Sequence, residues 1–173
     1  PSAGERWRIQ AKTGRYRGRI QLEWVEDLRF CGQAPLPPTA LDPAATDAYS
    51  AHEDQLVTLT APLVVADTYE LGRYGSLRLA LGGRAFTANN GVLGGTLLPL
   101  RLDDGSYRRD PRPVPHLDDQ GTRRAGDQLR SVTGILTRAF GDWRIHPVST
   151  DVFSADNPRP PIPVALDGLR VVQ

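Results

Sequence analysis

The sequence contains no methionine, a single lysine and a single cysteine. One cysteine excludes an internal disulfide, so Cys31 is either a small apolar residue at a strand end or pairs with a thiol outside these 173 residues. No apolar run approaches the roughly 18 residues of a membrane-spanning helix, and no signal peptide is recognisable. The start at Pro1 and the lack of methionine predict that upstream residues were removed or left out.

The sequence also lacks an excess of either charge, because its net charge is only +1. The balance is uneven, however: residues 1–38 carry +3, residues 39–70 carry −6 and residues 71–173 carry +4. Of the 21 cationic side chains, all but Lys12 are arginine. Arginine binds phosphate and stacks on bases better than lysine does, but a GC-rich genome produces the same bias. Charge alone therefore does not require a nucleic-acid partner.

Proline-rich stretches divide the chain into four parts. We expect a β-hairpin at 1–33, a linker at 34–46, a β-module at 47–154, and a second linker with the first strand of another domain at 155–173. Within the first part, alternating residues predict strands at 5–12, 15–25 and 27–31, with a turn at Thr13-Gly14 and a bulge at Gly18.

The β-module has short, frequent strands and few helical patterns. Strands are expected at 55–66 with a bulge or edge at Pro62, and then at 76–81, 84–87, 97–102, 128–138 and 143–148. A short helix is expected at 46–54, capped by Thr46 or Asp47. The pattern indicates an all-β fold, and the strand number and order match a five-stranded OB-type barrel. The OB helix would fall within the irregular segment 106–125.

A weak internal repeat links the first part to the module. Gly4–Arg8 resembles Gly126–Arg130, and Arg19-Ile20-Gln21 resembles Arg144-Ile145-His146. If these hairpins correspond, residues 4–30 are the end of a partial second OB module. A lone hairpin is barely stable, so this hairpin should then pack on or extend the barrel. Chance similarity between two arginine-rich hairpins is the alternative.

No catalytic or metal site is recognisable. The histidines at 52, 116 and 146 are scattered, and one cysteine cannot build a thiolate zinc site. His146 alternates with core positions, so we expect a strand histidine facing solvent or a backbone acceptor. Asp103-Asp104 precedes Gly105 and is typical of a turn rather than of an acid/base pair. No cofactor is therefore expected in this chain.

Binding has better support than catalysis. An OB barrel binds nucleic acid with strands 2 and 3 and the flanking loops, where bases stack on aromatic rings and arginines follow the backbone. The residues in those positions are Tyr69, Arg73, Tyr74, Arg78, Arg84, Arg138, Phe140, Trp143 and Arg144. Alternatively, Tyr74, Phe140 and Trp143 are corner residues that close the core. The pairs Arg108-Arg109 and Arg123-Arg124 are expected to be solvated loop charges.

Several motifs resemble one family in order and rough spacing. They are Tyr69–Gly75, Leu102–Ser106, Arg124–Asp127, Thr133–Leu136 and Phe140–Ile145. The family is the N-terminal region of secreted bacterial nucleases whose C-terminal half is an endonuclease/exonuclease/phosphatase domain. The resemblance covers about residues 47–172, and the segment 4–37 is similar to the OB-like region that precedes it. The sequence departs from the family at Ala51–Asp54.

The resemblance implies a non-catalytic OB-like module that positions DNA for a catalytic domain. The segment Leu169–Gln173 looks like the first strand of that domain, whose metal-site residues map to nothing in this chain. Mg²⁺ or Ca²⁺ would belong to that absent domain, and the location would be extracellular or on the bacterial surface. The partners implied are DNA and the following nuclease domain, with no membrane. A structural module that binds a protein or a second copy through exposed strand edges is the alternative.

Overall fold

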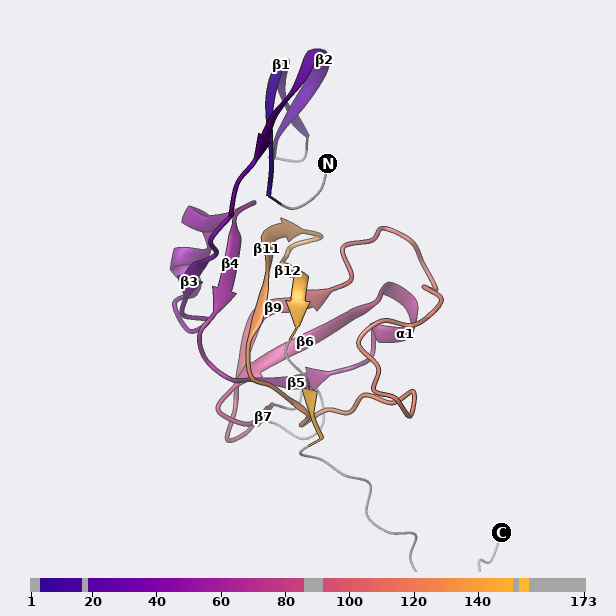
Figure 1. The fold of residues 1–173 in the computed structure, drawn as a ribbon. Helices are drawn as coiled ribbons and strands as arrows, with labels where there is room; N and C mark the ends of the chain where they lie inside the picture. The colour runs from indigo at the N-terminus through magenta and orange to yellow at the C-terminus, as the bar shows by residue number, and fades with distance from the viewer. Residues whose placement is uncertain (1–3, 17–18, 86–91, 151–152, 156–173) are drawn as a thin grey trace, which may run out of the picture. The chain divides into compact units, whose positions relative to one another are not determined.

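The computed structural model describes residues 4–16, 19–85, 92–150 and 153–155. The chain forms two compact units, Pro1–Pro37 and Pro38–Gln173. Their described parts are rich in strands and contain little helix, which confirms the all-β prediction (Figure 1). Gly18, the second linker from residue 156 and the strand expected at 169–172 lie outside the described residues.

The first unit is one antiparallel hairpin of β1 (Glu5–Tyr16) and β2 (Arg19–Gln33). The prediction of a turn at Thr13-Gly14 is wrong, because both residues pair with β2 inside a continuous strand. The separate third strand at 27–31 is part of β2. Strand propensity and long-range pairing thus override a short-range turn signal. Whether the hairpin packs on the second unit stays a prediction.

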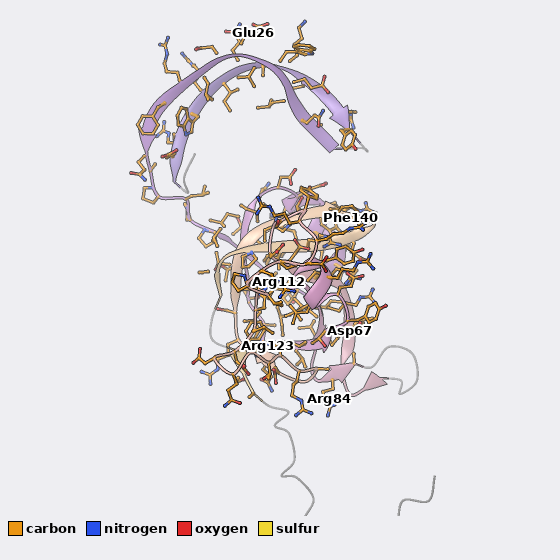
Figure 2. The ribbon with its side chains drawn as sticks, turned by 90° about the vertical axis from the view of Figure 1, so that its right-hand side faces the viewer. Glu26, Asp67, Arg84, Arg112, Arg123 and Phe140 are labelled. Atoms are coloured by element: carbon orange, nitrogen blue, oxygen red, sulfur yellow. The ribbon has the colours of Figure 1, made fainter. Side chains whose placement is uncertain are left out.

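Three register shifts bend the hairpin into the arc that Figure 2 shows. At each shift β2 carries one extra residue, at Trp24, Glu26 and Cys31, and Trp24 has φ 49°. These bulges place Ile9 opposite Leu28. The apolar side chains that these pairings bring together include Trp7, Ile9, Ile20, Leu22, Val25, Leu28 and Phe30. The hairpin alone leaves this face exposed, with Leu28 52% accessible.

The second unit is built on a nine-stranded mixed sheet with the order β13-β10-β5-β6-β9-β12-β11-β4-β3. Its strands are β3 (Thr39–Leu41), β4 (Leu56–Leu59), β5 (Leu63–Asp67), β6 (Ser76–Leu81), β9 (Thr96–Asp103), β10 (Gln128–Leu129), β11 (Val132–Ala139), β12 (Asp142–Thr150) and β13 (Phe153–Ser154). The order has two ends. Over the described residues the hydrogen-bonded sheet is therefore open, with nine strands rather than a closed set of five.

The segment 55–66 contributes strands to two separate positions in the sheet order. The expected strand 55–66 is divided at Pro62 into β4 and β5. Proline lacks the N–H that a ladder needs, which explains the break. β5 pairs with β6, and β4 pairs with β11. The β9 and β12 strands are parallel, while the β11–β12 hairpin and the β5–β6–β9 run are antiparallel.

The core lies against one face of this sheet and follows the period of two expected for strands. Leu77, Leu79, Leu100, Leu102 and Ile145 are buried and face inward. The 3₁₀ helix η1 (Thr46–His52) packs Tyr49 into the same core, where its ring meets Trp143 edge-on at 5.7 Å. Neither Thr46 nor Asp47 caps this helix, because Ala45 is the N-cap and no side chain bonds there.

Two further expectations for the second unit are wrong. No helix occurs within 104–127, which is an irregular excursion between β9 and β10. Of the return strand expected at 84–87, the described residues form β7 (Arg84–Ala85), which pairs with β8 (Val92–Leu93) rather than with β6, and residues 86–87 lie outside the described residues. The backbone at Gly82-Gly83 adopts positive φ, as expected for a turn. A short helix, α1 (Leu71–Tyr74), precedes β6 and was not expected.

Candidate ligand pocket at the β11–β12 turn

The outer face of the sheet carries a row of three arginines. Arg78 on β6 pairs in register with Arg101 on β9, and Arg101 pairs with Arg144 on β12. These positions alternate with the core leucines and with Ile145, so strand geometry alone places them on the opposite face. Like charges directly opposite each other destabilise a sheet. The row therefore requires nearby carboxylates.

Arg101 is held by two such carboxylates from different loops. Its Nη1 donates to Glu70 Oε2 at 2.8 Å, and its Nε donates to Asp142 Oδ2 at 2.6 Å. The Arg101 side chain is only 12% exposed. Glu70 lies immediately before α1, and Asp142 begins β12. Arg101 thus joins the loop before β6 to the turn between β11 and β12.

Asp103, Arg144 and His146 form a cluster next to this clamp, which we call the floor. Arg144 Nη1 donates to Asp103 Oδ2, and His146 Nε2 lies 3.4 Å from Asp103 Oδ1. Gly105 N–H donates to Asp103 Oδ1 at 3.0 Å, and Arg144 Nε donates to the Ala139 carbonyl at 3.3 Å. The Asp103 carboxylate therefore has charged or hydrogen-bonding partners at both oxygens.

Burial by itself would raise the pKa of Asp103. The His146 hydrogen bond, the Arg144 charge and the Gly105 N–H together outweigh burial, so the pKa lies below its ordinary value of 3.8. Asp103 is thus held as a carboxylate and neutralises Arg144. The charged and hydrogen-bonding groups of the floor therefore bond to one another.

The helix α1 forms a second wall. It ends at Gly75, whose φ of 65° is the left-handed C-cap conformation and whose N–H donates to the Leu71 carbonyl at 2.9 Å. A Cβ at Gly75 would meet Asp104 Oδ2 at 2.5 Å, so this position requires glycine. The excursion 104–127 lies beside α1 (Figure 1), and Asp110 N–H donates to the Arg73 carbonyl at 2.9 Å.

Aromatic rings and arginines face one another across this junction. Arg73 Cζ lies 5.3 Å from the centre of the Tyr74 ring, and Arg109 Cζ lies 5.9 Å from it. Tyr107 meets Phe140 edge-on at 6.1 Å, and Arg144 Cζ lies 5.2 Å from the Phe140 ring. Such contacts are favourable for arginine over an aromatic face.

These walls enclose a pocket of about 440 Å³ above the floor. That volume lies within the roughly 300–1,000 Å³ typical of small-ligand sites. Its outer lining consists of Tyr107, Arg108, Arg109 and Phe140, which we call the rim. Tyr107 is 77% exposed and Phe140 is 70% exposed. Arg108 and Arg109 are exposed, and neither forms an ion pair with an acidic side chain over the described part of the chain.

The structure gathers some of the predicted binding residues and separates others. Tyr74, Phe140 and Arg144 line the pocket, and Arg73 adjoins it through Tyr74. Arg78 lies in the arginine row beside it. Tyr69, which is 89% exposed, does not line the pocket.

The remaining predicted residues lie elsewhere. Figure 2 places Arg84 at the end of the second unit opposite Phe140. Trp143 packs on the core, as the alternative interpretation of the aromatic residues proposed, and exposed Arg138 lies with its Cζ 5.8 Å from the Trp143 ring. Phe140 does not follow that alternative, because most of its ring is exposed.

Several pocket residues were not among the binding residues predicted from the sequence; Arg108 and Arg109 were expected to be solvated loop charges. Tyr107, Arg108 and Arg109 follow the Asp103-Asp104-Gly105 turn, and an aromatic residue followed by two arginines was the available signal. The turn itself is confirmed, since Gly105 and Ser106 N–H groups donate to the two aspartates. His146 faces a carboxylate rather than a backbone acceptor.

Of the pair Arg123-Arg124, Arg123 is not solvated as expected. The Arg123 side chain is only 4% exposed, and its Nη1 lies 3.1 Å from Asp127 Oδ2. Its Nε also donates to the His116 carbonyl at 2.7 Å. Arg123 therefore fixes the excursion from within and is not available to a ligand.

Comparisons with known proteins give no relative: no family model, no curated protein sequence and no solved structure matches the chain. Over the described ranges, no group of three or more histidine, cysteine, aspartate and glutamate side chains is placed to hold a metal ion. No helix in that part of the chain is long and apolar enough to cross a membrane.

Proposed function

We propose that residues 47–154 form an OB-like module that binds nucleic acid without catalysing a reaction. The fold assignment is supported by the strand order β5-β6-β9-β12-β11-β4. β4 and β5 are two halves of one chain segment, so a single first strand would pair with β6 on one side and β11 on the other. The barrel strands would then be β4–β5, β6, β9, β11 and β12, as in a partly open Greek-key barrel.

The pocket is the observation that carries the binding assignment. It lies where the loop after the first barrel strand meets the turn between the last two, and these loops border the ligand groove of an OB barrel. Its rim combines exposed rings with arginines that have no acidic partner over the described residues. In the adjoining row, Arg101 and Arg144 are paired with carboxylates, so only Arg78, which has no ion pair over the described residues, supports a path for backbone phosphates beside the rim.

The wider setting follows from the sequence resemblance. We infer that the module belongs to a secreted or surface-located bacterial nuclease and positions DNA for a catalytic domain beyond these residues. The divalent-metal chemistry of that family would reside in the catalytic domain. The arrangement of Asp103, Arg144 and His146 is consistent with a scaffold role, since these three groups pair with one another.

The test is DNA affinity as a function of salt. Replacing Arg108 and Arg109 together with glutamine removes two charges from the rim without touching the floor. If both contact phosphate, the slope of log K against log[salt] for a single strand should fall by about 1.4. Arg130→Gln is the matched control, because Arg130 is exposed and precedes β11 at the end opposite the Phe140 turn. An equal loss in the control, or no DNA binding by the wild type, would overturn the assignment.

A second function is favoured by the hairpin. Its apolar face leaves Ile20 65% and Leu22 53% exposed within the hairpin, and such a face suits contact with a protein or a second copy. Leu22→Lys should then abolish a salt-independent oligomer on a sizing column. A monomeric wild-type chain that binds DNA would leave the nucleic-acid assignment as the sole function.

A further inference from the structure

The turn that carries Phe140 is unusual for its backbone. Phe140 has φ 55° and Gly141 has φ 88°, so both central residues of the β11–β12 turn are left-handed. Two-residue hairpin turns of this kind favour asparagine, aspartate or glycine at the first position, because a bulky side chain is strained there. A large ring at this position costs stability and is also 70% exposed. Strain of this kind gathers at functional sites.

The second exposed ring of the pocket faces the first. Tyr107 comes from the excursion after β9, yet its ring lies 6.1 Å from that of Phe140. Neither ring contributes to the core cluster, in contrast to Tyr49 and Trp143. Two exposed rings beside a 440 Å³ pocket form a surface suited to a flat aromatic ligand.

The charges around the pocket indicate which kind of flat ligand it favours. The floor is neutralised internally by the Asp103–Arg144 pair, and Glu70 is occupied by Arg101. The exposed guanidinium groups next to Tyr107 belong to Arg108 and Arg109. The pocket thus offers an aromatic wall with cations at its mouth, which matches a nucleobase joined to a phosphate.

We propose that the pocket takes one unpaired nucleotide, with its base against Phe140 and Tyr107 and its phosphate at Arg108 and Arg109. The proposal rests on the proposed nucleic-acid function and specifies it. A base within a duplex has both faces stacked and cannot enter, so the site selects single strands or frayed ends. The module would hold a strand end rather than the duplex body.

Phe140→Asn is the decisive variant, because asparagine tolerates the left-handed backbone while removing the ring. Binding of a fluorescent hexathymidylate should weaken about five- to 150-fold, and the melting temperature should stay the same or rise. Phe140→Tyr keeps the ring and should retain affinity. Tyr107→Ala, at a position 77% exposed, should weaken hexathymidylate binding in the same direction without lowering the melting temperature.

A blunt DNA hairpin serves as the second probe and separates the outcomes. We expect weaker binding of this duplex and no effect of Phe140→Asn upon it. If the wild type binds single strand and duplex equally and Phe140→Asn changes neither, the module binds DNA but the pocket does not take a base. If Phe140→Asn lowers affinity and melting temperature together, the ring is structural and the proposal is wrong. If neither probe binds, the nucleic-acid function fails as well.

Discussion

The floor and the rim of the pocket use the same residue types in opposite ways. On the floor, Arg144 pairs with a buried carboxylate, and Arg101 beside it pairs with two more. On the rim, Arg108 and Arg109 are exposed and form no ion pair over the described residues, and the ring of Phe140 is mostly accessible. Arginines with carboxylate partners stabilise the fold, whereas exposed rings and exposed arginines without a carboxylate partner are available to a ligand. The contrast separates stability from binding within one pocket.

The largest effect should come from Arg144→Met. The change leaves Asp103 buried with no guanidinium partner, and breaking a buried pair costs about 3–5 kcal/mol. We expect a loss of about 3 kcal/mol in the free energy of unfolding, measured by urea denaturation. A loss below about 0.5 kcal/mol, the size of an ordinary surface change, would place Arg144 on the ligand side of the contrast.

A double-mutant cycle is the control for that prediction. Asp103→Asn alone should also destabilise, because Arg144 then loses its carboxylate. In the Arg144→Met background the same Asp103→Asn change should cost less free energy of unfolding. The guanidinium is already absent there, so Asp103→Asn removes a buried carboxylate charge that has lost its partner. Additive effects in the cycle would show that the pair does not couple.

Arg101→Ala should lower the free energy of unfolding by less than Arg144→Met does, but still measurably. Both carboxylate partners of Arg101 are about 30% exposed, so solvent screening reduces the value of each contact. We expect a loss of about 1–2 kcal/mol. Arg78→Ala is the matched control, because Arg78 lies next in the row and has no ion pair over the described residues. Equal losses in the two variants would contradict a clamp role for Arg101.

Acid should weaken the floor. The folded-state pKa of Asp103 lies below the ordinary 3.8, so its contribution to stability is present above about pH 4 and is lost as pH falls through the folded pKa. The pKa of Asp118 is also lowered, by hydrogen bonds from Thr122, so the wild type alone does not isolate Asp103. Unfolding free energies of wild type and Asp103→Asn should converge below pH 4. A constant difference between them from pH 7 to pH 2 would refute the assignment.

The smallest stability effect should belong to the rim. Arg108→Gln with Arg109→Gln should change the free energy of unfolding by less than about 0.5 kcal/mol, because both side chains are exposed. Differential scanning calorimetry with Arg144→Met alongside gives the comparison directly. If the Arg108→Gln, Arg109→Gln variant lost as much free energy of unfolding as Arg144→Met, the floor and the rim would not differ in their contribution to stability.

Much of the strand content could be predicted from the sequence. The alternation of Leu77 and Leu79 follows from the period of two. The missing proline N–H predicted an irregularity at Pro62, but the division of the expected strand 55–66 into β4 and β5 was not predicted. The turn predicted at Thr13-Gly14 was wrong, because these residues pair in unbroken register with Leu22 and Gln21, and that pairing across the hairpin overrides a short-range turn signal.

Only some of the pocket residues could be predicted from the sequence, because contacts between segments distant in sequence decide which side chains pair. Loop position and residue type pointed to Tyr74 and Phe140, and both line the pocket. Residue type does not report whether an arginine meets a carboxylate, so Arg144 was grouped with ligand-binding arginines although it pairs with Asp103. Arg108 and Arg109 were taken as solvated charges. They are exposed, and the fold of the excursion also brings them to a pocket.

The measurement that tests the central claim most directly is an amide chemical-shift titration with a short single-stranded oligonucleotide. We expect the largest shifts in the segments 107–110 and 139–144, which carry the four rim residues, and little change at β7 (Arg84–Ala85) at the opposite end of the unit. Shifts confined to the hairpin or to β7, or no shifts at millimolar oligonucleotide, would contradict a nucleic-acid site at this pocket.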